Sequence, residues 1–114
     1  MASPDVKTLN RVFSALSDPT RRAIVRQLTK GESTVGQLGA PFDLAPATLS
    51  KHLRVLADAG LVRQTRDGRF LRTRLSPGPL WSSLGWLEEL RLLWDEQLDN
   101  LEVLLRRERQ RRQS

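Results

Sequence analysis

The sequence contains no cysteine and no tyrosine, and His52 is its single histidine. Without cysteine the chain can form neither a disulfide framework nor a thiolate metal site, and one imidazole offers little to a metal. The sequence also lacks a glycine-rich phosphate loop and a nucleophile motif, which argues against an enzyme. We therefore expect no catalytic site, no metal site and no cofactor.

Long apolar runs are also missing. No stretch approaches the roughly 18 apolar residues of a membrane span, and no signal-peptide pattern opens the chain. We expect a protein that does not contact membranes and that is located in the cytoplasm. Its 114 residues suffice for one domain with a modest core.

Charge is distributed unevenly along the chain. Residues 1–75 hold 13 Lys/Arg and 6 Asp/Glu, residues 76–105 hold 1 and 6, and residues 106–114 hold 5 and 1. A basic body followed by an acidic segment indicates one surface that meets a polyanion and another that meets protein or solvent. An ordinary solvated surface is the alternative, above all for the basic tail.

The most informative stretch is residues 44–75. Leu49, Leu53 and Leu56 fall on one side of a predicted helix, and Lys51 and Arg54 fall on the opposite side. Gly60 is placed to end this helix in the left-handed conformation that glycine adopts easily. A helix with a short polar face is thus followed immediately by the next element.

That next element is a predicted two-stranded hairpin. The pair Asp67-Gly68 separates two strand-like runs, and Asp-Gly is a strong two-residue turn signal because both turn positions need a positive φ. This register places Arg66 and Arg69 at the tip. One face then carries Val62, Gln64, Leu71 and Thr73, and the other carries Arg63, Thr65, Phe70 and Arg72.

The remaining chain predicts four more helices. Asp18-Pro19 begins the second helix, and Thr34 with Gln37 forms a capping box that begins a short third helix. The third helix and the helix after Pro46 form a helix-turn-helix pair. A long last helix runs from Leu80 to about Arg106. The fold class is therefore mainly α with a small β-hairpin, a winged helix-turn-helix with the order of four helices, two strands and one helix.

The chain resembles the ArsR-type winged helix-turn-helix repressors. The matching stretches are residues 15–24 (ALSDPTRRAI), residues 48–56 (TLSKHLRVL) and residues 59–62 (AGLV). The last helix is similar to that of a subgroup lacking metal ligands. The resemblance implies a homodimer joined by the first and last helices, which binds an operator and represses transcription until a signal releases it. Ala45 and Pro46 depart from the Ser and Gln that the family often has at the start of this helix.

Candidate DNA-contacting residues follow from the polar helix face, the hairpin tip and the second helix. They are Thr48, Ser50, Lys51, His52, Arg54, Arg66, Arg69, Arg21, Arg22, Arg63 and Arg72. Arg and Lys can pair with guanine edges or phosphates. For His52 a structural role is an equal alternative, Arg21 and Arg22 are divided between phosphates and ion pairs, and Arg63 and Arg72 are open to pairing with acids.

The first and last helices carry candidate dimer contacts. These are Leu9, Val12, Phe13, Leu84, Leu87, Trp94, Leu98 and Leu101. The final helix has more apolar side chains than a single chain of this size requires, and a two-fold axis would let two copies cover them. The tryptophans are expected in the core or the dimer interface, with a small-molecule pocket as the alternative.

The sequence thus predicts residues 1–106 as a winged helix-turn-helix domain with dimerisation helices at both ends. Residues 107–114 form a basic tail that is expected to be disordered. The expected function is a dimeric repressor that binds a pseudo-palindromic operator in double-stranded DNA and responds to an unknown small-molecule or protein effector. Two alternatives stay open: a winged-helix module that binds protein, and a metal sensor that uses Asp, Glu and His52.

Overall fold

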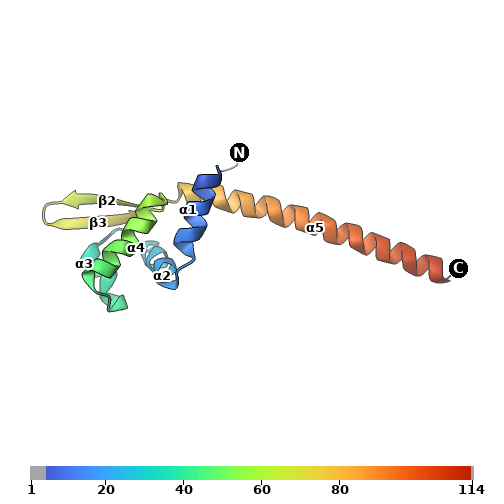
Figure 1. Cartoon of the computed structure of the whole chain (residues 1–114), viewed down its shortest axis with the longest axis horizontal. Helices are drawn as coiled ribbons and strands as arrows, with labels where there is room; N and C mark the ends of the chain where they lie inside the picture. The colour runs from blue at the N-terminus through green and yellow to red at the C-terminus, as the bar shows by residue number, and fades with distance from the viewer. Residues whose placement is uncertain (1–4, 114) are drawn as a thin grey trace.

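The computed structural model describes residues 5–113, which form a small body and one long projecting helix (Figure 1). The Cα extents are 79 × 31 × 22 Å, because the last helix leaves the body. The elements are α1 (Val6–Leu16), α2 (Pro19–Leu28), β1 (Ser33–Thr34), α3 (Val35–Gly39), the 3-10 helix η1 (Ala40–Phe42), α4 (Pro46–Asp58), β2 (Val62–Asp67), β3 (Phe70–Leu75) and α5 (Gly78–Gln113). The mainly helical fold class with a small sheet is confirmed.

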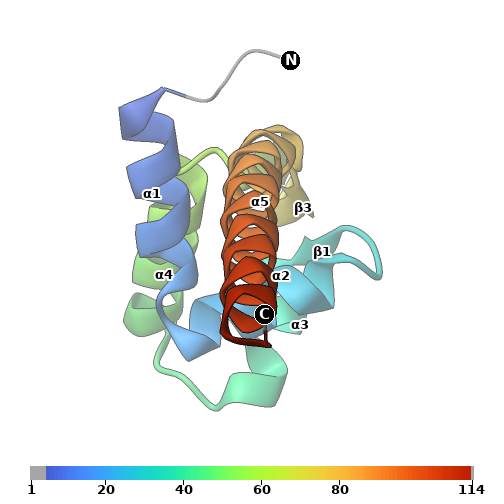
Figure 2. The same ribbon diagram turned by 90° about the vertical axis from the view of Figure 1, so that its right-hand side faces the viewer.

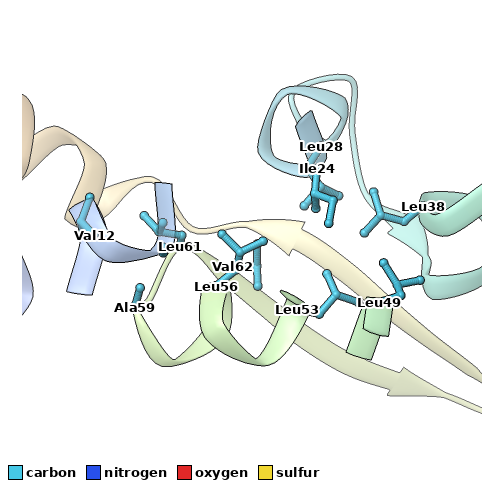
Figure 3. Close-up of a cluster of buried hydrophobic side chains, with 11 residues drawn as sticks. Val12, Ile24, Leu28, Leu38, Leu49, Leu53, Leu56, Ala59, Leu61 and Val62 are labelled. Atoms are coloured by element: carbon cyan, nitrogen blue, oxygen red, sulfur yellow. The ribbon is translucent and has the colours of Figure 1, made fainter. Parts of the chain in front are cut away.

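The core of the body joins helices α1, α2, α3 and α4 to the sheet. Leu49, Leu53 and Leu56 of α4 are buried, as their spacing predicts, and they meet Ile24 of α2 and Leu38 of α3 (Figure 3). Burying each such side chain contributes roughly 1.5–3 kcal/mol relative to leaving it exposed. The polar face of α4 is thereby directed away from the body.

Side-chain caps fix where the helices begin. Asp5 accepts a hydrogen bond from the backbone N–H of Thr8, and Asp18 accepts one from Arg21. Thr34 and Gln37 each accept the other's backbone N–H, so the predicted capping box is confirmed. Such caps satisfy amides that have no partner inside the helix.

The hairpin has a different turn from the predicted one. Asp67 pairs with Phe70, so the two loop residues are Gly68 and Arg69 rather than Asp67 and Gly68. Only Gly68 of this pair has a positive φ, +61°, which is the pattern of a type II′ turn. The shift moves the register by two residues and preserves the predicted faces, with Thr73 buried on the inner one.

The sheet has three strands in the order β1-β3-β2 rather than two. Ser33 pairs with Thr73 and Thr34 pairs with Arg72. A strand of two residues has no alternating pattern of its own, so the sequence gives no sign of it. This extra strand ties the hairpin to the start of α3.

Helix α5 has 36 residues, and within residues 5–113 it packs against the body only at its beginning. Leu80 packs against the core, Ser83 is buried, and the Trp86 ring packs edge-on against Phe13 of α1 at a centroid distance of 6.0 Å. Every residue from 87 to 107 is exposed. Figure 2 looks along this helix and shows α1 beside it.

The helix does not end near Arg106, and the tail from residue 107 onward is not disordered as predicted but helical to Gln113. Ion pairs one turn apart support this extension, among them Arg106 with Glu102 and Arg112 with Glu108. Arginines in the last turn also interact favourably with the helix dipole. Within residues 5–113, none of the helices combines the length and the apolar character needed to cross a membrane.

Candidate nucleic-acid interface

The polar face of α4 is the first part of the candidate interface. Thr48, Ser50, Lys51 and Arg54 are all exposed. Within residues 5–113 their side chains make no hydrogen bond or ion pair, so their donors are available to another molecule. Lys51 and Arg54 lie opposite the buried leucines of the same helix, and Thr48 and Ser50 flank them, as the sequence predicts.

Among the described residues, no side chain caps the N-terminus of α4. Ala45 occupies the N-cap and Pro46 the first helical position, and the backbone N–H groups of Thr48 and Leu49 both donate to the Ala45 carbonyl, at 3.0 and 3.1 Å. Asp43 has a left-handed backbone, with φ of 49°, and its side chain supplies no cap. The positive end of this helix dipole is therefore open to an anion.

His52 lies on the edge of α4 that meets α2, and it is held by intrachain contacts. Its Nδ1 lies 3.3 Å from a terminal guanidinium nitrogen of Arg21 and 3.9 Å from the Asp18 carboxylate. The structure thus gives His52 a positioning role at the α2–α4 contact.

Arg21 and Arg22 both donate to the carbonyl end of α1. The Nε of Arg21 donates to Ala15 at 2.7 Å, a terminal nitrogen of Arg21 donates to Ser14 at 3.2 Å, and Arg22 donates to Leu16 at 2.8 Å. Neither residue forms an ion pair with a carboxylate among the described residues, which was the predicted alternative to phosphate contact. The backbone N–H of Arg21 lowers the pKa of Asp18 below its ordinary value, and the charges of Arg21 and His52 add to this effect.

The hairpin is the second part of the candidate interface. Arg66 and Arg69 are exposed beside and within the turn, and in the described part of the chain their guanidinium groups have no partner. Arg72 donates to Asp67 at 3.1 Å, so this predicted contact pairs with an acid instead. The hairpin points away from the body in the direction opposite to α5 (Figure 1).

Arg74 was not among the predicted residues. It is exposed, and it lies directly across the sheet from Arg63 on the outer face that also carries Arg72. Like charges directly opposite each other destabilise a sheet, so an anion between Arg63 and Arg74 would be favourable. Side chains alternate between the two faces of a strand, so the sequence of β3 already indicates that Arg74 shares a face with Arg72.

Together these groups form a surface suited to binding a negatively charged polymer whose bases present hydrogen-bonding edges. Hydroxyl, ammonium and guanidinium donors on one helix can read base edges, and the arginines of a projecting turn can reach phosphates. Among residues 5–113 no group of three or more His, Asp or Glu side chains is arranged to hold a metal ion. The geometry therefore offers binding chemistry through donors and positive charge.

The predicted dimer residues fall into two groups. Phe13 and the last-helix residues Leu84, Leu87, Trp94, Leu98 and Leu101 are exposed. Val12 is fully buried in the core of its own chain, so the expectation that it contacts a partner is wrong. Leu9 is half-buried on α1.

Sequence comparisons match the helix-turn-helix part of the chain. Residues 16–65 match a family model described as a helix-turn-helix domain. The chain is 35% identical over 79 residues to the transcriptional repressor SdpR of Bacillus subtilis, which covers 69% of this chain and 88% of that protein. It is 39% identical over 87 residues to the HTH-type transcriptional regulator CmtR of Mycobacterium tuberculosis, covering 76% of this chain and 74% of the relative.

Solved structures give the same result. A crystal structure of an ArsR family transcriptional regulator matches with a TM-score of 0.77 and 36% identity, over 82% of this chain and 97% of the other. An ArsR-like transcriptional regulator from Rhodococcus sp. RHA1 matches with a TM-score of 0.75 and 30% identity, over 86% and 92%. These similarities extend well beyond the helix-turn-helix into the flanking helices.

Proposed function

Since this chain belongs to the ArsR family of DNA-binding transcriptional repressors, we propose that it represses as a homodimer on a pseudo-palindromic operator. The observation that carries the proposal is the polar face of α4, where Thr48, Ser50, Lys51 and Arg54 are exposed and have no partner in the described part of the chain. This face lies on the second helix of the helix-turn-helix, the element that enters the major groove in such proteins.

We assign different tasks to the two parts of the interface. Lys51 and Arg54 have the donors to read guanine edges, and Thr48 and Ser50 supply hydroxyls to bases or phosphates. Arg66 and Arg69 of the hairpin would neutralise phosphates beside the groove. Arg21 and His52 hold α1, α2 and α4 together and thereby orient the reading helix.

The homodimer is supported by the apolar surface of α5. Leu98 and Leu101 are about half exposed, and large apolar patches on a monomer indicate a partner. Because a two-fold dimer presents two reading helices, the operator would repeat its sequence about one helical turn away, roughly 34 Å. Half-site spacing is thus a direct consequence of the dimer.

We further propose that release from DNA does not use a metal. The sequence has no cysteine and one histidine, and that histidine is already engaged by Arg21. Zinc and related ions prefer thiolate and imidazole ligands. The effector would then be a small molecule or a protein.

The test is selection of DNA from a random duplex library, followed by sedimentation of the free protein. We expect selected duplexes to share two inverted half-sites and to bind with a steep salt dependence, because phosphate contacts release counterions. If the selected duplexes share no sequence, and if DNA binding is weak and its affinity does not change with salt concentration, the result would favour a protein-binding module instead. A monomer at tens of micromolar would refute the homodimer.

A further inference from the structure

We propose that the pocket between α2 and η1 binds a small organic anion with an apolar body, and that this anion is the effector that releases the protein from DNA. The effector role rests on the proposed repressor function, whereas the binding site itself does not. The inference names the chemical class of a ligand that the proposed function leaves open. It also places that ligand outside the surface that reads DNA.

The pocket has the size and the lining of a ligand site. Its volume is about 440 Å³, and small-molecule sites have volumes of about 300–1,000 Å³. Pro19 and Ala23 of α2 and Phe42 of η1 form its apolar part. Phe42 is half-buried and packs against the core, so the pocket has a fixed apolar wall. An aromatic or branched apolar body can pack against this wall.

Three cations surround the apolar part of the pocket. Arg22, Arg26 and Lys30 follow one another at steps of four residues, so they lie along one side of α2. Among the described residues that line this pocket, none is acidic. The pocket between α1 and α4 differs, because Arg11 and Asp58 both line it. An excess of positive charge beside an apolar wall favours a ligand that is negative at one end and apolar at the other.

The polar side chains of the pocket have donors available for an anion. Arg26 and Lys30 are exposed, and in the described part of the chain neither side chain makes a hydrogen bond or an ion pair. The half-buried amide of Gln27 likewise has no partner among the described residues. Arg22 donates to the Leu16 carbonyl at 2.8 Å, but a guanidinium has five N–H donors. A carboxylate in the pocket can therefore accept several charge-assisted hydrogen bonds at once.

The cations lie on the side of α2 that faces away from the reading helix. Ile24 points from α2 toward the buried leucines of α4 (Figure 3). Arg22 and Arg26 each lie two positions from Ile24, which is about 200° around the helix at roughly 100° per residue. They are therefore directed away from α4. An operator on the polar face of α4 and an anion in the pocket occupy different surfaces of the body.

The position of the pocket couples its ligand to DNA binding. Only residues 43–45 lie between the end of η1 and the start of α4, so a ligand against Phe42 acts on the connection that leads into the reading helix. The bound anion also lowers the positive charge of a body that binds a polyanion. It does so from about one helix diameter away, roughly 10 Å, which is close to the Debye length at about 0.1 M salt. This charge effect gives the sign: the anion weakens operator binding, and the operator weakens anion binding by the same factor.

Benzoate is the probe for the site, and benzamide, which has the same ring without the charge, is its neutral control. Each compound is titrated into the protein without DNA, and binding is followed by the backbone amide resonances of the whole chain. We expect benzoate to shift the resonances of α2 and η1 above all others. Benzamide should bind about tenfold more weakly, because it cannot form the charge-assisted hydrogen bonds.

Two matched double variants test the cations. Arg26→Gln/Lys30→Gln should bind benzoate about tenfold more weakly than the wild type. Lys7→Gln/Arg11→Gln removes the same charge from exposed positions on α1, including the cation of the pocket between α1 and α4, and it should bind benzoate like the wild type. Because all four side chains are exposed, both variants should keep the wild-type melting temperature. At fixed ionic strength, saturating benzoate should weaken operator binding of the wild type by about fivefold or more in fluorescence anisotropy, and benzamide should not.

Three results would overturn the proposal. Resonance shifts centred on α5, or equal affinities for benzoate and benzamide, would exclude the anion site. Benzoate bound in the pocket with unchanged operator affinity would exclude the effector role. A flatter salt dependence of DNA binding by Arg26→Gln/Lys30→Gln without benzoate would show that these cations contact phosphates instead. A protein that binds no operator under any condition would refute the repressor function, and the titration without DNA would still decide whether the anion site exists.

Discussion

Removing the two arginines at the hairpin turn should change how binding depends on salt. Arg66 and Arg69 are exposed and have no partner among residues 5–113, and they lie at the end of a hairpin that projects from the body. A phosphate contact by such a side chain releases a counterion and carries no sequence information. The double variant Arg66→Ala/Arg69→Ala should therefore weaken binding to specific and random DNA alike.

The size of the change in salt dependence follows from the number of arginines removed. The proposed dimer has two hairpins and hence four of these side chains, and each phosphate contact contributes about 0.9 to the slope of log K against log salt. Loss of all four flattens the slope by about 3.6. Between about 50 and 200 mM salt the wild-type protein should then lose roughly 150-fold more affinity than the variant.

Fluorescence anisotropy with one selected duplex and one random duplex measures both slopes. The matched control is Lys7→Ala/Arg11→Ala, which removes the same charge from exposed positions on α1. Helix α1 lies against α5 and not beside the hairpin (Figure 1), so its slope should stay close to wild type. If the hairpin variant and this control have the same slope, the turn does not touch phosphate.

Four further results are expected. Lys51→Ala or Arg54→Ala should weaken operator binding by about 1–3 kcal/mol and change the preferred bases, because a base edge loses its donor; unchanged affinity and preference in a repeated selection would contradict the groove assignment. Stoichiometric zinc, or a chelator, should leave operator affinity unchanged at fixed ionic strength, and a shift of tenfold or more in anisotropy would contradict the proposal of metal-independent release. Leu98→Glu should give a monomer by sedimentation and abolish operator binding, since a charge buried at the interface costs several kcal/mol; a variant that remains dimeric would exclude this face. Asp18→Asn should lower the melting temperature near neutral pH, and this effect should shrink progressively as the pH falls below about 3.8, because a carboxyl with a lowered pKa stabilises the fold fully above its unfolded pKa and loses that contribution as the pH falls through its folded pKa; a difference in melting temperature that stays unchanged down to about pH 2 would show that its charge is not the cause.

Much of the fold was predictable because local signals and packing agree. The leucines of α4, the capping box at Thr34 and the left-handed Gly60, whose φ is +75°, are all determined by neighbouring residues. Strand β1 was not predictable, because its two residues pair with β3 about forty positions away. The sequence predicts the turn one residue too early, because Gly68 satisfies a type II′ turn as well as the type I′ turn that Asp-Gly favours.

The sequence predicts which residues of the candidate site are exposed, but it does not predict which of them pair with other groups of the same chain. Exposure of Lys51 and Arg54 follows from helical periodicity alone. The engagement of Arg21 with the carbonyls of α1 depends on where that helix ends in space, which periodicity does not describe. Whether Arg72 is available depends on the register that brings it to Asp67. Tertiary contacts therefore decide which cations remain available for DNA.

In the proposed homodimer, whose subunits meet through the apolar face of α5, the unbroken length of this helix sets the distance between the two DNA-reading bodies. Seven residues inserted before Leu90 would preserve the apolar face, since seven residues are close to two turns. Each body would nevertheless move outward by about 10 Å, at 1.5 Å per residue. The reading helices would separate by about 20 Å, or roughly six base pairs at 3.4 Å each. That is more than half a turn of DNA, so the second half-site would lie on the opposite side of the duplex. The length of this helix and the spacing of the operator are thus coupled, and neither can change alone without loss of binding.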